Sequence, residues 1–280
     1  MTKSFVTLPT FCSAIVLGVI ITTGTVRAQT TENKVNLAYD FTGGGLRILA
    51  ATFDLTFDKK TYQVKSRLRT KGLANVFSKS VTYLDARGTL GAKQTLPVEF
   101  QSRTKNGKGR KTANITWQKK NKQKIEVLPH PNPSKQASID KVLKSSFPDP
   151  LSALVAITLS TDKLCRNKIR AFDGRKIFDF KMEYIGLEEL KRGEAGSYFG
   201  PAHKCSFKNI PIAGYSKKKM KAYRSKPTPA YTVWFAAIGS ASMKKKIFVP
   251  VKAAGTINWA SVDVVVTEGS INGQPFTAAY

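Results

Sequence analysis

The chain has 280 residues, of which 41% are hydrophobic and 23% are charged. This composition is that of a globular protein and excludes a disordered, collagenous or polytopic membrane protein. The charge is unusual, because 46 Lys and Arg residues against 18 Asp and Glu residues give a formal net charge of +28. Two histidines and three cysteines leave few ligands for zinc, haem or iron–sulfur groups, so we expect neither a metal site nor a cofactor.

The N-terminus has the pattern of a secretory signal peptide. Lys3 supplies a short positive region, residues 11–21 are apolar, and Val26 and Ala28 are small residues at positions −3 and −1 of a cleavage site. The apolar run is shorter than the roughly 18–20 residues that a membrane span needs, which favours a cleaved signal over a retained anchor. We therefore predict a signal peptide over residues 1–28, cleavage after Ala28 and a protein that is peripheral to the membrane.

Cleavage would remove Cys12 and leave two cysteines, Cys165 and Cys205. An even pair in an exported protein predicts one disulfide, which would close a loop of about 40 residues. A reactive thiol is the alternative. His203 stands two residues from Cys205, and in a strand this spacing places both side chains on one face.

Alternation of apolar and polar residues dominates the rest of the chain. Phe53, Leu55 and Phe57 alternate with polar residues, and Lys59-Lys60 then reads as a hairpin turn. The same period recurs at Tyr62, Val64 and Leu68, at Val98 and Phe100, at Ile115 and Trp117, and at Phe178, Phe180, Met182 and Tyr184. Such alternation predicts antiparallel strands with one buried face and one solvated face.

Turn residues separate these strands. Asn106-Gly107 and Asn272-Gly273 predict tight hairpins, Asp173-Gly174 predicts a chain reversal, and the three glycines at 43–45 predict a bulge or a sharp bend. We count about fifteen strand-like segments, which is too many for a small sheet. The sequence therefore predicts an all-β, mainly antiparallel fold, either a sandwich or a curled, partly closed barrel.

One segment interrupts the strand pattern. After a proline-rich connector at 129–133, residues 138–146 predict a short helix, and Asp149-Pro150 supplies the N-cap and the first-turn proline of a second helix. Residues 151–159 are apolar on nearly every side, so we place this helix in the core, with a shallow membrane-surface helix as the alternative. No long hydrophilic linker is present, and we predict a single domain over residues 29–280 with a helical insert at about 138–160.

Several short motifs resemble those of an exported bacterial family, the domain of unknown function 3108. They are Thr70–Ala74, Asp149–Leu151, Phe172–Asp179, Cys205 followed by Ile210–Tyr215, and Phe248–Val251. The resemblance implies an antiparallel β protein in the periplasm or envelope of a Gram-negative bacterium, with no assigned activity.

The basic residues gather in runs without acidic residues. The anion-binding candidates in the first two runs are Arg103, Lys105, Lys108, Arg110, Lys111, Lys119 and Lys120, and then Lys217, Lys218 and Lys219. A third run lies at 244–246. Such a field attracts polyanions, which in the periplasm are lipopolysaccharide, anionic phospholipid and acidic glycan, whereas nucleic acid is normally absent. A solvated surface whose lysines protect sheet edges from aggregation is the alternative.

The usual catalytic signatures are missing from the sequence. Glu183, Glu188 and Glu189 could form a carboxylate pair, but their spacing equally suits a solvated strand edge, which we favour. We therefore predict a non-enzymatic envelope protein that binds an anionic or lipidic component through a basic rim and a curved sheet. A scaffold or adapter that docks another envelope protein through an exposed strand edge is the alternative.

Overall fold

A computed structural model describes residues 32–72, 74–77, 79–91, 95–118, 122–160, 164–166, 168–226, 230–239, 243, 246–257 and 260–276. The segment Thr31–Tyr280 forms one compact unit. The predicted signal peptide at 1–28, with its cleavage site after Ala28, lies outside the described residues. Within them, no helix has both the length and the apolar character that a membrane crossing requires.

The described residues form one sheet of fourteen antiparallel strands. Seven strands precede the helical insert: β1 (Asn33–Gly43), β2 (Leu46–Phe57), β3 (Thr61–Thr70), β4 (Ser80–Leu90), β5 (Thr95–Asn106), β6 (Gly109–Gln118) and β7 (Lys122–Leu128). Seven follow it: β8 (Lys168–Phe172), β9 (Ile177–Ala195), β10 (Tyr198–Ala213), β11 (Tyr231–Ile238), β12 (Ile247–Ile257), β13 (Ala260–Ile271) and β14 (Gln274–Pro275).

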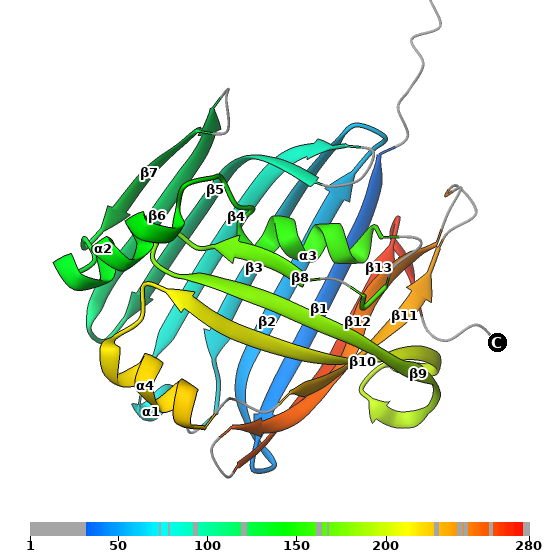
Figure 1. The fold of residues 1–280 in the computed structure, drawn as a ribbon. Coiled ribbons are helices and arrows are strands. Elements are labelled where there is room, and N and C mark those ends of the chain that lie inside the picture. The colour runs from blue at the N-terminus through cyan, green and yellow to red at the C-terminus, as the bar shows by residue number, and fades with distance from the viewer. Residues whose placement is uncertain are drawn as a thin grey trace, which may run out of the picture. The chain divides into compact units, whose positions relative to one another are not determined.

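The pairing of β1 with β13 joins the two halves into a single sheet. The order across it is β7-β6-β5-β4-β3-β2-β1-β13-β12-β11-β10-β9-β8, and β14 pairs with β13. Figure 1 shows that the sheet curls round so that β8, β9 and β10 pass in front of the strands of the N-terminal half. The edge strands β7 and β8 do not pair with each other, so the sheet is curled but not closed. The predicted all-β, mainly antiparallel fold is confirmed.

Four helices accompany the sheet in the described residues: α1 (Ala74–Phe77), α2 (Pro133–Val142), α3 (Pro150–Thr158) and α4 (Lys217–Ser225). The predicted cap of α3 is confirmed, because the Asp149 carboxylate accepts hydrogen bonds of 2.9 Å from the backbone N–H groups of Leu151 and Ser152. The predicted start of α2 at Ser138 is wrong. Asn132 caps this helix and Pro133 is its first residue, the same signal that begins α3.

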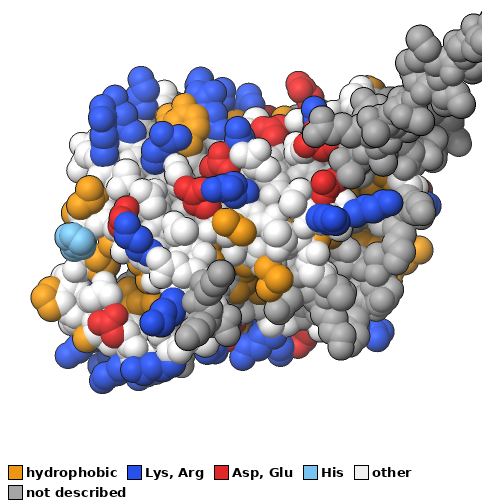
Figure 2. Space-filling view, turned by 90° about the horizontal axis from the view of Figure 1, so that it is seen from above, with side chains coloured by type: hydrophobic (Ala, Val, Ile, Leu, Met, Phe, Trp, Pro, Cys, Tyr) orange, Lys and Arg blue, Asp and Glu red, His pale blue; other side chains and the backbone are white. Residues whose placement is uncertain are grey.

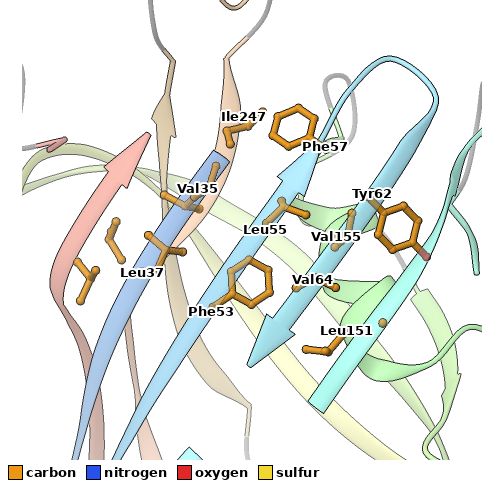
Figure 3. Packing of buried hydrophobic residues seen from close by; sticks show 14 of the residues in the cluster. Val35, Leu37, Phe53, Leu55, Phe57, Tyr62, Val64, Leu151, Val155 and Ile247 are labelled. Carbon is orange, nitrogen blue, oxygen red and sulfur yellow. The ribbon is translucent and has the colours of Figure 1, made fainter. Parts of the chain in front are cut away.

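Helix α3 fills the inside of the curl. Ala153 and Val155 are completely buried, and the helix contacts β3, β4, β5, β8 and β12. Figure 3 shows Leu151 and Val155 beside Val64 and Tyr62, which point inward from β3. The prediction of a buried central helix is therefore confirmed, and the alternative of a membrane-surface helix is wrong for this segment.

The turn between β8 and β9 links the two edges of the sheet. Gly174 in this turn has a φ of 87°, and a Cβ there would lie 2.8 Å from the Cβ of Ala113 on β6. The next residue, Arg175, donates hydrogen bonds to the backbone carbonyls of Thr112 (3.0 Å), Leu128 (2.6 Å) and Pro129 (2.6 Å). Because β8 is one edge of the sheet and β7 the other, these bonds hold the curl in place without a strand ladder.

Two predicted strand faces are wrong. On β9, Tyr184 was expected on the buried face with Met182, yet Tyr184 is 41% exposed, at the point where the pairing of β9 with β10 shifts.

The second wrong face is on β5. Val98 was expected on the buried face with Phe100, yet Val98 is 37% exposed and Phe100 is 1% exposed. The pairing of β4 with β5 shifts by one residue, so that Arg87 faces Glu99 while Gly88 faces Pro97. This bulge leaves Val98 without a partner and interrupts the alternation.

The predicted disulfide between Cys165 and Cys205 is present, with 5.9 Å between the two Cα atoms. Both residues are completely buried, and the bond ties the chain just after α3 to strand β10. The sulfur of Cys205 is therefore not a free reactive thiol in this structure. His203 instead lies beside Tyr184 and Phe248, and partial burial lowers the pKa of its imidazole.

Candidate anion-binding face

The outer face of strands β3 to β6 carries a concentration of basic side chains. On these strands Val64, Ala86, Phe100 and Ile115 point into the core. Their sequence neighbours therefore point outward, because side chains alternate between the two faces of a strand. The register of the strands decides which outward side chains lie opposite one another.

Two neighbouring rows of this face are almost entirely basic or aromatic. In the first row Arg69 faces Val81, Val81 faces Lys105, and Lys105 faces Arg110. In the second row Arg67 faces Tyr83, and Tyr83 faces Arg103. We call the residues Arg67, Arg69, Tyr83, Arg103, Lys105 and Arg110 the basic face.

The third row marks the limit of the basic face, because acidic residues begin there. Lys65 faces Asp85, and Asp85 faces Gln101. One row further, the guanidinium of Arg87 lies 2.8 Å from the carboxylate of Glu99. Figure 2, which looks at the molecule from above, shows Asp and Glu side chains interspersed with Lys and Arg side chains on that side of the molecule. Positive charge is thus left uncompensated in the two rows nearest the β5–β6 turn.

The five cationic groups of the basic face have no carboxylate within 4.0 Å among the described residues. Lys105 and Arg110 stand directly opposite each other, and like charges in this position destabilise a sheet. Tyr83 is 46% exposed, and the guanidinium carbon of Arg67 lies 5.4 Å from its ring centroid. Mutual repulsion of this kind is relieved when an anion binds between the cations.

The structure places the predicted anion-binding residues at different parts of the molecule. Arg103, Lys105 and Arg110 lie together on the basic face, and Lys108 lies in the adjoining β5–β6 turn. Lys111 faces Thr104 on the other side of the sheet, so it points away from this group. Lys119 and Lys120 lie outside the described residues, as do residues 244 and 245 of the third run.

Lys217, Lys218 and Lys219 begin helix α4, which the sequence analysis did not predict. The Ser216 side chain caps this helix by accepting a hydrogen bond of 3.2 Å from the backbone N–H of Lys219. None of its residues is buried. The helix follows Tyr215, whose ring lies 5.2 Å from the ammonium group of Lys219. Figure 1 shows α4 at the lower end of the view, the end at which α1 connects β3 to β4.

Sequence reasoning missed Arg67, Arg69 and Tyr83 as members of the site. The alternation along 62–69 does place both arginines on the solvated side of their strand. Their meeting with Arg103 and Lys105 depends on the register of three strands, which the sequence pattern does not specify. A search for rows of unpaired cations across predicted hairpins would have found part of this group.

Two of the three glutamates considered on β9, Glu183 and Glu188, each pair with a lysine. A lysine ammonium lies 2.6 Å from the carboxylate of Glu183, and another lies 2.6 Å from that of Glu188. The hydrogen bond from Lys181 lowers the pKa of Glu183, and the bond from Lys204 lowers that of Glu188. These carboxylates are held ionised on a solvated strand, as the favoured interpretation expected.

The sequence comparisons identify the family. The family model described as "Protein of unknown function (DUF3108)" matches residues 34–263, which is most of the chain. The chain belongs to the DUF3108 family. The expected resemblance is thereby confirmed, and the Phe172–Asp179 motif of this DUF3108 protein contains the turn through which Arg175 links the sheet edges.

Comparison with solved structures gave a match of low sequence identity. A β-barrel-like protein of the domain of unknown function DUF1849 from Brucella abortus is 9% identical, with a TM-score of 0.47. The alignment covers 86% of this chain and 98% of the Brucella chain. No curated protein matches the sequence.

Proposed function

We propose that this DUF3108 protein is a non-enzymatic periplasmic protein that binds an anionic component of the Gram-negative envelope through the basic face. The candidate components are lipopolysaccharide, anionic phospholipid and acidic glycan. The observation that carries the proposal is the pair of rows on β3 to β6, where five cations lie together without a carboxylate within 4.0 Å in the described residues.

Charge alone gives such a face a measurable affinity for an anionic surface. Each Lys or Arg close to an anionic membrane contributes about 1 kcal/mol at physiological ionic strength. The attraction decays over a Debye length, about 8–10 Å near physiological salt, so binding should weaken steeply as salt is added. The Lys108 ammonium in the β5–β6 turn and the exposed lysines of α4 would extend the same field.

The packing of the interior favours binding of the anionic component at the outer surface of the sheet. Helix α3 fills the curl with completely buried side chains such as Val155. Among the described residues, the hollows of about 390, 350 and 220 Å³ are lined largely by exposed or half-buried residues. A component bound on the outside is therefore better supported than a lipid carried inside the sheet.

Sedimentation with vesicles tests the proposal. We expect the wild-type protein to co-sediment with vesicles that contain phosphatidylglycerol at low salt, and to remain in solution with pure phosphatidylcholine. The variant Arg69→Gln, Lys105→Gln, Arg110→Gln should lose most of this binding. The variant Lys59→Gln, Lys60→Gln, Arg192→Gln removes the same charge from exposed positions elsewhere and should retain it. Equal binding by the two variants would contradict the role of the basic face.

A scaffold function is the second candidate, and the free edge of β7 favours it. This strand pairs with β6 on one side and with no other strand in the described residues. Lys122, Lys124 and Glu126 are exposed along it, and charged side chains protect a free edge from aggregation while still permitting a specific partner strand. A photo-crosslinker at position 124 should give one dominant protein adduct in cells if the scaffold function is correct, and none if it is wrong.

A further inference from the structure

The hollow beside Tyr83 has groups suited to an anionic ligand and others suited to hydroxyl groups. It has a volume of about 220 Å³, and Arg67, Tyr83, Arg103, Asp85 and Gln101 contribute to its lining. We propose that it is a subsite for an anionic sugar, a single sugar ring that carries a phosphate or a carboxylate. This inference rests on the proposed function, because it names the class of ligand that the basic face recognises.

Arg67 and Arg103 form the anion-binding part of the subsite. They come from β3 and β5 and stand on either side of Tyr83 on the intervening strand β4. Both side chains are exposed, and within the described residues neither has a carboxylate partner. A guanidinium binds a phosphate or carboxylate through two parallel hydrogen bonds, so two guanidinium groups separated by one strand can hold a single anionic group between them.

Tyr83 provides the surface for the sugar ring. The guanidinium of Arg67 lies over one face of its ring, while in the described part of the chain no cation or aromatic ring covers the other face. An exposed tyrosine combines an apolar face with a polar hydroxyl, and this combination suits a sugar that presents C–H groups on one face and hydroxyl groups at its rim. The ring of Tyr83 thus offers a stacking surface next to the two cations.

Acidic and amide groups at the other side of the hollow select for hydroxyl groups. Asp54 and Asp85 line it, and ionised carboxylates accept hydrogen bonds but donate none. Asp54 already accepts a bond of 2.8 Å from the Asn36 amide, and the Asp85 carboxylate is 4.0 Å from the Lys65 ammonium. An anionic sugar whose charged group lies at Arg67 and Arg103 can donate its ring hydroxyl groups to these carboxylates, whereas inorganic phosphate has no ring hydroxyl groups to donate. The arrangement therefore discriminates between an anionic sugar and a simple anion.

The size of the hollow agrees with one ring rather than an oligosaccharide. Pockets for drug-sized ligands have volumes of about 300–1,000 Å³. At about 220 Å³ this hollow is smaller and open, so a monosaccharide unit at the end or along the side of a larger molecule fits it best. An open site of this size also implies weak affinity for an isolated sugar, and the measurement must cover the millimolar range.

Ligand-observed NMR at low salt tests the subsite with four probes: glucose 1-phosphate, glucuronate, glucose and inorganic phosphate. We expect glucose 1-phosphate or glucuronate to bind about tenfold more tightly than glucose and inorganic phosphate. Whichever anionic sugar binds more tightly identifies the anionic group. Tyr83→Ala should weaken that binding about tenfold, the upper end of what an aromatic contact contributes. Tyr184→Ala removes a ring that is 41% exposed on β9 and should have no effect.

A second pair of variants tests the subsite without replacing Tyr83, so the result does not depend on how Tyr83→Ala affects folding. Arg103→Gln should weaken binding of the anionic sugar, and Arg192→Gln should leave it unchanged. Equal affinity for inorganic phosphate and the anionic sugars, or unchanged binding by Tyr83→Ala, would overturn the subsite. If the wild type binds phosphatidylglycerol vesicles but no anionic sugar, the subsite is wrong and the proposed function stands. If it binds neither, both are wrong.

Discussion

Arg175 donates a hydrogen bond of 2.6 Å to the backbone carbonyl of Leu128, the last residue of the strand at the opposite edge of the sheet. The same guanidinium also donates hydrogen bonds to the carbonyls of Thr112 and Pro129. One side chain in the β8–β9 turn therefore bonds three carbonyl oxygens near the opposite edge of the sheet. The turn that carries Arg175 is shaped by Asp173, which accepts bonds of 2.8 and 2.7 Å from the backbone N–H groups of Arg175 and Lys176. This arrangement gives a structural reason for the Phe-Asp-Gly-Arg-Lys sequence.

Replacement of Arg175 by methionine should lower the free energy of unfolding by about 1.5–3 kcal/mol, the range that a hydrogen bond from a charged group contributes. The loss should not exceed this range, because water can reach the exposed carbonyls of Leu128 and Pro129 once the guanidinium is gone. Urea unfolding followed by circular dichroism measures this change. Arg224→Met, at an exposed position on α4, is the matched control and should change stability by less than about 0.5 kcal/mol. A similar small effect at Arg175 would show that the curl does not depend on this contact.

Stability should depend on the protonation of Asp149. This carboxylate is completely buried, and burial raises its pKa from 3.8 to about 6, although hydrogen bonds from Ser152 and from the backbone oppose the shift. Because the pKa is raised in the folded state, the contribution of Asp149 to stability is fully present below about pH 4 and is lost as the pH rises through about 6. The loss amounts to roughly 3 kcal/mol by linkage.

The variant Asp149→Asn tests this dependence, since asparagine also caps helices and carries no charge. The free energy of unfolding of the wild type minus that of the variant should fall by roughly 3 kcal/mol between pH 4 and pH 7. Asp140→Asn, at an exposed position on α2, controls for the loss of one carboxylate. A difference between wild type and Asp149→Asn that stays constant over this range would contradict the prediction.

Loss of the disulfide should also destabilise the fold. The bond spans 40 residues, and the loss of chain entropy in the unfolded state corresponds to about 4 kcal/mol. Cys165→Ala, Cys205→Ala and the double variant should all be destabilised by a similar amount, because each removes the same bond. Unfolding in urea without reductant measures this. Additive effects of the two single replacements would show that the cysteines contribute through packing and not through the bond.

Local patterns in the sequence predicted the strand faces and the buried helix well. The alternation at Phe53, Leu55 and Phe57 and the Asp149-Pro150 start of α3 depend on short-range chemistry, and the structure has both. The errors arise where the outcome depends on pairing. Val98 is exposed because a bulge at this residue interrupts the pairing of β5 with β4. Helix α2 begins earlier than predicted because Asn132-Pro133, which also fits a connector, acts as a helix start.

In the candidate site, too, the sequence predicted what depends on local pattern and not what depends on strand pairing. The runs of lysine and arginine identified Arg103, Lys105 and Arg110 from the sequence, but Arg67, Arg69 and Tyr83 lie twenty or more residues away from them along the chain. They meet only because β3, β4 and β5 pair in one register. Conversely, Lys111 was grouped with the others by proximity in sequence, although the pleat of β6 places it on the opposite face.

Site-specific photo-crosslinking in intact cells tests the central claim most directly. A photo-reactive amino acid at position 83, with mass spectrometry of the purified adducts, should capture a phosphate- or carboxylate-bearing lipid or glycan. The adduct should disappear when Arg69, Lys105 and Arg110 are all replaced by glutamine, and the same probe at position 184 should not give it. Absence of any such adduct at position 83, or an equal yield at position 184, would contradict the account.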